Sequence, residues 1–362
     1  MSRRPRLRDL GITTGQLEPG PLNAITDVEG IMVGHATLVS DAPRVVRTGV
    51  TAIWPRASIW SQWCFAGTHS FNGNGEMTGL PWLAEQGLLA APICITNTMS
   101  VGVVRDAICA FAVERGIEQP FHLPVVAETW DGWLSDAESF PVTQAMAFEA
   151  MASAKGGPVA EGNVGGGTGM ICHEFKGGIG TASRRVQTAG QRYTVGALVQ
   201  TNYGRRHLFR VNGVPVGLEI GPDVVPSDRF PEPKSSIIVI LATDVPLIPI
   251  QCQRLARRAT TGLAWVGGIG ANSSGDIFLA FSTGNAVKPD ATTSEVRMLG
   301  PDAMTPLFEA AAEATEEAIL NAMIAAETMT GFKGRTVHAL PHDKLVEVMR
   351  RYRPAGTRGA VR

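Results

Sequence analysis

Several features that would assign the chain to a common functional class are missing. The 362 residues carry a formal net charge of -1, so there is no basic field for a nucleic acid or a membrane surface. The five cysteines are scattered and form no Cys-x-x-Cys pair, which argues against a disulfide framework and a zinc knuckle. The longest apolar stretch, 237–250, contains Asp244, Pro246 and Pro249 and is too short to span a bilayer. No apolar run follows the basic N-terminus, as a secretory signal would require, so we expect a soluble, cytoplasmic protein.

Familiar catalytic motifs are absent as well. No Gly-x-Ser-x-Gly elbow surrounds a serine, and the seven histidines form no His-Glu-x-x-His pair. His338 and His342 are four residues apart, but Pro341 between them disfavours a shared helical face. The glycine-rich run 162–169 is not followed by Gly-Lys-Ser/Thr, so close backbone packing explains it better than a phosphate site does.

Strand-like and helix-like segments alternate along the chain. This intermixing predicts a layered α/β fold, and no composition shift marks a boundary, so we expect one domain over residues 1–362. Runs rich in Val, Ile and Thr predict strands at 30–38, 49–55, 92–96, 123–129, 193–201, 236–243 and 277–282. Helical patterns lie at 80–89, 101–114, 143–154, 251–265 and 306–328.

Two other segments carry specific expectations. The polar, Pro-rich stretch 205–234 looks like a surface insertion, because long irregular segments are usually added to a scaffold. On the helix predicted over 306–328, Glu309, Glu313 and Glu317 recur every four residues and are interpreted as a solvated stripe. Glu316 borders the apolar face of that helix, with Ala312, Ile319 and Met323 as neighbours.

The stretch "GANSSGDIFLAFSTGN" (270–285) places two serines in a turn before an apolar strand. It has two interpretations. Asn-Ser and Ser-Gly are ordinary turn chemistry. Alternatively, the chain cleaves itself before a serine, whose freed α-amine, with an ordinary pKa of about 7.7–8.0, then acts as the base for its own hydroxyl. That arrangement would need no histidine.

The same stretch resembles the autoproteolysis segment of the L-aminopeptidase/D-esterase and β-aminopeptidase family, whose members are N-terminal-nucleophile hydrolases. Further segments that resemble the family follow in one order along nearly the whole chain. They are "DVEGIMVGHATL" (27–38), "NGNGEMTG" (72–79), "AETWDGWL" (127–134), "GNVGGGTGMICHEFKGGIGTASR" (162–184), "LVQTNYG" (198–204), "ILATDVPL" (240–247) and "ATEEAILNAMIAAETMTG" (314–331).

The resemblance implies a four-layer α-β-β-α sandwich and a set of site residues. The nucleophile is Ser274, which gives cleavage into 1–273 and 274–362; Ser273 is the runner-up. Asn202 would help to form the oxyanion hole, and Glu128 would bind the substrate's free amino group. Glu316 matches a family glutamate near the nucleophile, where a buried carboxyl could tune the pKa of the amine.

Trp130 departs from the family pattern. Many relatives carry Tyr in this Glu-Thr-Tyr-Asp-Gly motif, and an indole N–H donates a hydrogen bond but does not relay a proton. We therefore place Trp130 at the substrate site without a proton-transfer role; a pocket-wall or core aromatic is the alternative.

The implied activity is removal of N-terminal residues from short peptides, amides or esters through an acyl-enzyme on Ser274. The resemblance also implies no metal, no organic cofactor and a homo-oligomer of the cleaved pair. Two other functions remain open from the sequence: an acyl transfer to another amine in a biosynthetic pathway, and an unprocessed binding protein of the same fold.

Overall fold

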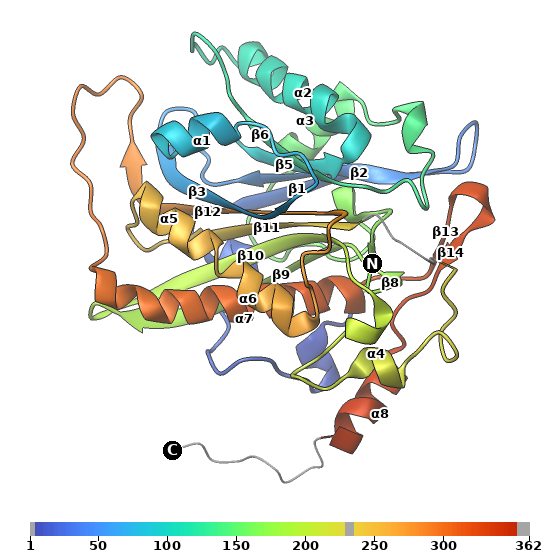
Figure 1. Cartoon of the computed structure of the whole chain (residues 1–362). Coiled ribbons are helices and arrows are strands. Elements are labelled where there is room, and N and C mark those ends of the chain that lie inside the picture. Colours follow the sequence, from blue (N-terminus) through green and yellow to red (C-terminus); the bar gives the residue numbers. More distant parts are fainter. Residues whose placement is uncertain (1–3, 229–234, 353–362) are drawn as a thin grey trace.

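Two stacked β-sheets lie between two layers of helices (Figure 1), which confirms the expected α-β-β-α sandwich. The computed structural model describes residues 4–228 and 235–352. The first sheet has the order β1-β2-β5-β6, built from Met32–Ser40, Val46–Trp54, Ile93–Asn97 and Val125–Thr129. The second has the order β4-β3-β12-β11-β10-β9, built from Leu88–Leu89, Trp63–Gly73, Ser274–Val287, Ser235–Thr243, Gln191–Asn202 and Ile179–Thr188.

Helices cover the outer face of each sheet. Helices α2 (Val101–Glu114) and α3 (Gln144–Ala152) cover the first sheet, while α5 (Pro249–Ala256), α6 (Ala259–Val266) and α7 (Thr305–Ile324) cover the second (Figure 1). The smaller elements are α1 (Leu80–Gln86), α4 (Val216–Glu219), α8 (His342–Tyr352), β7 (Ile171–Cys172), β8 (Phe175–Lys176), β13 (Met329–Thr330) and β14 (Thr336–Val337). In the described ranges, no helix is both long and apolar enough to cross a membrane.

Strand β11 shows how the sequence builds both halves of the core. Because successive side chains of a strand point to opposite faces, Ile238 and Ile240 pack between the sheets. Ile237 and Val239 pack against the helical layer. All nine residues of the strand are buried, which explains why it appears in the sequence as a continuous apolar run.

Several expected elements appear where the sequence predicts them, and others do not. Helix α2 spans the predicted residues, but the helix expected over 251–265 is divided into α5 and α6. Strand β3 was not predicted, because its glycines and polar residues resemble a loop. Gly67 in β3 lies directly under α5, where an added Cβ would approach the backbone nitrogen of Gln253 to 2.3 Å. Close packing of helix on strand therefore selects glycine at that position.

The segment 205–234 is irregular, as expected, but the expectation of a surface insertion is wrong for its first part. Phe209, Val211, Val216 and Ile220 belong to the core between the second sheet and its helices. These apolar side chains are separated by polar and proline residues, so no helical or strand period reveals their burial. The end of the segment, 229–234, lies outside the described residues.

Candidate active site

Ser274 is the first residue of the central strand β12. The strand runs between β3 and β11, and Ser274 pairs with Ser235 at one end of the second sheet. A tight turn precedes it, in which the backbone N–H of Ser274 donates to the carbonyl of Ala271 over 2.7 Å. Ser274 is buried, whereas Asn272 in the same turn is exposed. The Ser273–Ser274 peptide bond thus lies at the boundary between an exposed turn and a buried strand.

Two asparagines at the end of β3 hold this turn. The side-chain amide of Asn74 donates to the carbonyl oxygen of Ser273 over 2.9 Å. The side-chain amide of Asn72 donates to the carbonyls of Ala271, over 3.0 Å, and of Ser274. The carbonyl on the N-terminal side of the Ser273–Ser274 bond therefore already has a side-chain donor. The Asn-Gly-Asn-Gly motif of these residues contributes to the family resemblance, but the sequence alone did not predict a role for either asparagine.

Asp276 is the hydrogen-bond acceptor for the Ser274 hydroxyl, with Oγ and Oδ1 2.6 Å apart. Residues two apart on a strand share a face, and β12 begins at Ser274, so the carboxyl lies beside the hydroxyl. Burial raises the pKa of Asp276 to about 6, against the opposing hydrogen bonds from the Ser274 hydroxyl and the Ile237 N–H. The sequence reasoning missed Asp276 because it started the strand at Ile277.

Glu128 lies at the end of β6 and is 3% exposed. Its carboxylate accepts the backbone N–H of Glu76 over 2.9 Å and the hydroxyl of Thr98. Burial raises its pKa, although these two hydrogen bonds oppose the shift. A Cβ added to Gly75 would lie 3.0 Å from the Cα of Gly275 and 3.2 Å from Oε1 of Glu128. Gly75 therefore lies next to both this carboxylate and Gly275, the second residue of β12.

Asn202 ends strand β10 and lies in the same row of the sheet as Ser236 and Gly275. Its side-chain amide donates to the carbonyl of Trp130 over 2.8 Å and accepts the N–H of Ile171 over 3.0 Å. Since cross-strand neighbours share a face, Asn202 lies on the face opposite to that of the Ser274 side chain. In the uncleaved chain the structure does not bring this amide to the Ser274 hydroxyl.

Trp130 follows β6 directly and is half-buried. Its indole ring packs over Gly132, where an added Cβ would lie 2.5 Å from the ring. Its backbone carbonyl is the group that Asn202 contacts, so Trp130 and Asn202 are adjacent. Trp133 is separate, because it packs in a small cluster with Leu134, Ile171 and Val337.

Glu316 lies on α7, on the helical side of the second sheet. Its carboxyl accepts the backbone N–H of Asn212, and burial raises its pKa to about 7, a shift that the positive charge of Arg184 opposes. An added Cβ at Gly262 of α6 would lie 3.0 Å from the Glu316 nitrogen, which places Glu316 at the contact between two helices. These contacts do not join it to Ser274, so its catalytic role stays a prediction.

The solvated stripe expected on this helix is wrong for two of its three members. Glu309 is exposed, but Glu313 and Glu317 are 3% and 0% exposed. Arg184 on β9 contacts both carboxylates, at 2.8 and 2.7 Å, and Arg8 contacts Glu317 at 2.8 Å. Buried carboxylates persist where guanidinium groups pair with them. The arginines come from distant parts of the chain, so spacing along the helix does not predict the pairing.

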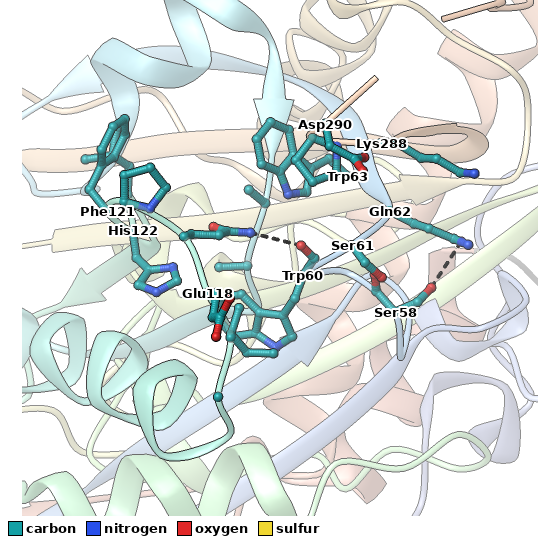
Figure 2. Close-up of a pocket in the computed structure, with 18 of the residues that line it drawn as sticks. Ser58, Trp60, Ser61, Gln62, Trp63, Glu118, Phe121, His122, Lys288 and Asp290 are labelled. Atoms are coloured by element: carbon teal, nitrogen blue, oxygen red, sulfur yellow. Dashed lines mark hydrogen bonds between the residues drawn. The ribbon is translucent and has the colours of Figure 1, made fainter. Parts of the chain in front are cut away.

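Two hollows lie at opposite ends of β12. The larger, about 950 Å³, is lined by aromatic side chains that include Trp60, Trp63 and Phe121, with Lys288 and Asp290 at its rim (Figure 2). It contains none of the predicted site residues. The smaller, about 40 Å³, is lined by the cleavage-turn residues Ser273 and Ser274, by Asp276 and by Tyr203, Gly204 and Ser235. Chemistry rather than size therefore locates the candidate site, even though ligand sites are usually large.

Histidine and metal chemistry are not evident at this turn. His173 is the histidine behind the smaller hollow, and it packs against the ring of Tyr203 with centroids 4.9 Å apart. Burial lowers its pKa to about 4, so it is neutral near pH 7. Within residues 4–228 and 235–352, no group of three His, Cys, Asp or Glu side chains is arranged to hold a metal ion.

Comparison with known proteins identifies close relatives over almost the whole length. The model of peptidase family S58 matches residues 23–337. A beta-peptidyl aminopeptidase of Sphingosinicella microcystinivorans is 46% identical, over 96% of this chain and 93% of the relative. Among solved structures, a Burkholderia beta-aminopeptidase superposes with a TM-score of 0.88 at 50% identity, covering 96% of this chain and 99% of that one. The L-aminopeptidase D-Ala-esterase/amidase of Ochrobactrum anthropi, described as a serine aminopeptidase with a variant of the Ntn-hydrolase fold, gives 0.89 at 45% identity with the same coverage.

Proposed function

The chain belongs to peptidase family S58, and from this premise we propose that it is a serine aminopeptidase that activates itself by cleavage between Ser273 and Ser274. The products would be a large fragment, 1–273, and a small fragment, 274–362. The observation that carries the proposal is the Ser273–Ser274 bond itself. It occupies an exposed turn at the start of a central strand, with a donor on its carbonyl and an acceptor on the Ser274 hydroxyl.

Cleavage would create the nucleophile and its base on one residue. The freed α-amine of Ser274 would take the hydroxyl proton as Oγ attacks a substrate carbonyl, because its ordinary pKa of about 7.7–8.0 is close to neutral pH. Strand β12 holds Ser274 between β3 and β11, which restricts the orientation of the nucleophile. The acyl group of the substrate would then form an ester with Oγ, and water would release it.

Glu128 would select substrates with a free amino group. Its carboxylate lies beside Gly75, which in turn lies beside Gly275 of β12. A substrate ammonium bound next to Glu128 would compensate the charge of this buried carboxylate. Asn202 would stabilise the oxyanion once the new terminus turns toward its face of the sheet. The indole of Trp130 would form part of the wall beside Asn202 and restrict the substrate's side chain.

The substrates would be short peptides, amides or esters with an unblocked N-terminal residue. The names of the relatives mention both β-peptidyl and L- or D-configured substrates. A Cβ added to Gly75 would lie 3.2 Å from Oε1 of Glu128, so there is little room beside this carboxylate. The distance from the substrate's amino group to its scissile carbonyl would then set the preference. A panel of aminoacyl p-nitroanilides of both configurations and of β-amino-acid amides measures it. Added acceptor amines in the same assay separate hydrolysis from acyl transfer.

Self-cleavage is tested on a denaturing gel of purified protein. The wild-type chain should give two bands, and N-terminal sequencing of the smaller should begin at Ser274. Ser274→Ala should remain intact and reduce turnover by at least about 10⁴-fold, the scale of losing a nucleophile. Ser273→Ala is the matched control and should still cleave. Cleavage of Ser274→Ala combined with none in Ser273→Ala would show that the nucleophile is Ser273.

The proposal extends to a homo-oligomer of the cleaved pair that resides in the cytoplasm. The two fragments would stay associated, because β12 of the small fragment pairs with β3 and β11 of the large one. Light scattering of the native protein measures the assembly, and fractionation of cells measures the location.

A further inference from the structure

We propose that Asp276 is the general base of the self-cleavage step and that Asn74 supplies the donor for its oxyanion. This inference rests on the proposed self-cleavage at Ser273–Ser274 and names the residues that perform it. The freed α-amine cannot serve as the base at this stage, because the nitrogen of Ser274 is still an amide. The uncleaved chain therefore needs a base and a donor different from those of the mature enzyme.

The geometry supplies a base for the hydroxyl. Ser274 Oγ donates to Oδ1 of Asp276 over 2.6 Å, a short bond typical of a charged acceptor. In the described structure, no histidine hydrogen-bonds this hydroxyl. Asp276 is buried beneath the turn at 2% exposure, so its carboxylate reaches the hydroxyl without competition from bulk water.

The geometry also supplies a donor for the oxygen that gains charge. The Asn74 side-chain amide donates to the carbonyl oxygen of Ser273 over 2.9 Å in the uncleaved chain, so a donor is already in place on the oxygen that becomes the oxyanion. Asn72 contacts the carbonyls of Ala271 and Ser274, so it fixes the turn without touching the reacting carbonyl. The Ser274 N–H donates to Ala271, which holds the scissile amide in place.

Self-cleavage first transfers the acyl group of Ser273 from the Ser274 nitrogen to Oγ. The Asp276 carboxylate takes the Oγ proton, and Oγ attacks the carbonyl carbon of Ser273 while Asn74 holds the resulting oxyanion. Collapse breaks the bond between that carbon and the Ser274 nitrogen. The proton passes from the Asp276 carboxyl to this nitrogen, leaving an ester on Oγ and a free α-amine. Water then hydrolyses the ester, giving a carboxylate at Ser273 and restoring the hydroxyl.

The surroundings of Asp276 determine the expected pH dependence. Tyr203 and Arg205 are the titratable side chains that line the same hollow, while β11 contributes Ser235 and the Ile237 N–H. Burial raises the pKa of Tyr203 well above its ordinary value, so Tyr203 stays neutral in the tested range. The raised pKa of Asp276, about 6, means that the base is protonated below this pH. Cleavage should slow as the pH falls through 6 and level off above 7.

The test follows cleavage of newly synthesised chains in a cell-free system. The chains are incubated at pH values from 5 to 8. Samples are withdrawn over time, and the intact and cleaved chains are separated on a denaturing gel. Asp276→Asn keeps the shape of the side chain but cannot take a proton, so we expect cleavage to slow by about 10²–10⁴-fold, the usual contribution of a general base. Its residual rate should show no inflection near pH 6. Asn74→Ala should slow cleavage by about 10²–10³-fold, the cost of one oxyanion donor.

Two controls separate this inference from the proposed function and from misfolding. Asp244→Asn removes a half-buried carboxylate that accepts the Thr194 N–H at the far end of β11, and should cleave at the wild-type rate. If Ser274→Ala still cleaves before residue 274, the proposed function fails. If Ser274→Ala is intact but Asp276→Asn and Asn74→Ala cleave at the wild-type rate, only the present inference fails. Near-ultraviolet circular dichroism checks the fold of each variant, and Asn74→Ala carries the test if Asp276→Asn does not fold.

Discussion

The start of β12 and the buried side of α7 both place carboxyl groups in the interior, but with opposite surroundings. On α7, Glu313 and Glu317 face the guanidinium groups of Arg184 and Arg8. Burial disfavours the charge of Glu317, but its hydrogen bond to Arg8 and the charge of Arg184 outweigh burial and lower its pKa. At the start of β12, Asp276 faces a hydroxyl and its pKa is raised to about 6. The carboxylates paired with arginines serve the structure of α7. At Asp276, burial brings the pKa of a carboxyl close to neutral pH beside a reactive hydroxyl, which suits it to proton transfer.

The largest effect on stability should come from breaking the α7 ion pairs. Glu317→Gln removes the ion-pair partner of Arg8 and leaves Arg184 paired with Glu313 alone, so the free energy of unfolding should fall by about 3–5 kcal/mol. Urea unfolding measures this in the Ser274→Ala background, where the chain stays in one piece. Glu309→Gln, at an exposed position of the same helix, should change it by no more than about 0.5 kcal/mol.

The comparison also predicts what Glu317→Gln leaves unchanged. In otherwise wild-type chains that have folded, self-cleavage and turnover should match the wild type, because no contact joins Glu317 to the described turn residues. Loss of cleavage in a variant of normal stability would remove the distinction between the two regions.

The next effect concerns Glu128, the carboxylate near the cleavage turn that has no cationic partner among its described hydrogen bonds. Glu128→Gln should lower kcat/KM for peptides with a free N-terminus by about 10–100-fold, since a hydrogen bond to a charged group contributes about 1.5–3 kcal/mol. N-acetylated substrates, already poor, should show no further loss. Gels should still show complete self-cleavage, because the scissile turn does not use this carboxylate. An equal loss for both substrates would argue against amino-group recognition.

A further effect, of similar size, decides to which region Glu316 belongs. Its pKa is raised to about 7 by burial, so ionisation of this group opposes folding. Its contribution to stability is fully present below about pH 4.5 and is lost as the pH rises through 7. Glu316→Gln removes this dependence, so relative to the wild type the variant should gain about 1–3 kcal/mol of unfolding free energy between pH 4.5 and 8.

Unfolding in the Ser274→Ala background at both pH values measures this gain, and kcat in the cleaved enzyme measures the chemistry. A change in stability alone places Glu316 with the structural carboxylates of α7. A fall in kcat at unchanged stability places it with the site, as the family resemblance implies.

The family relationship and the layered fold could be predicted from the sequence, because motif order and hydrophobic runs are local properties. The helix over 101–114 was found from its helical pattern of apolar residues, and the strand over 236–243 as a short run rich in Val, Ile and Thr. The undetected strand β3 contains Gly67, whose lack of a side chain leaves room for helix α5, a distant part of the chain. The strand propensity of one segment does not reveal which helix packs against it.

The candidate site divides in the same way. Ser274 and Glu128 were identified from motifs; Ser274 begins β12, and Glu128 lies on β6 with Gly75 between its carboxylate and Gly275. Asp276 was hidden because Ser-Gly-Asp resembles a turn, whereas pairing with β3 and β11 extends the strand back to Ser274. Asn72 and Asn74 lie about 200 residues away in sequence from the bond they hold.

By itself, the sequence determined the family, the alternation of strands and helices, and the serine at which the chain is expected to cleave, since each depends on neighbouring residues. The tertiary structure alone decided which buried carboxyls are paired with arginines and which one receives the serine hydroxyl. Both outcomes follow from burial and from partners brought together by folding, and these set the charge of a carboxyl more strongly than its position along the chain does.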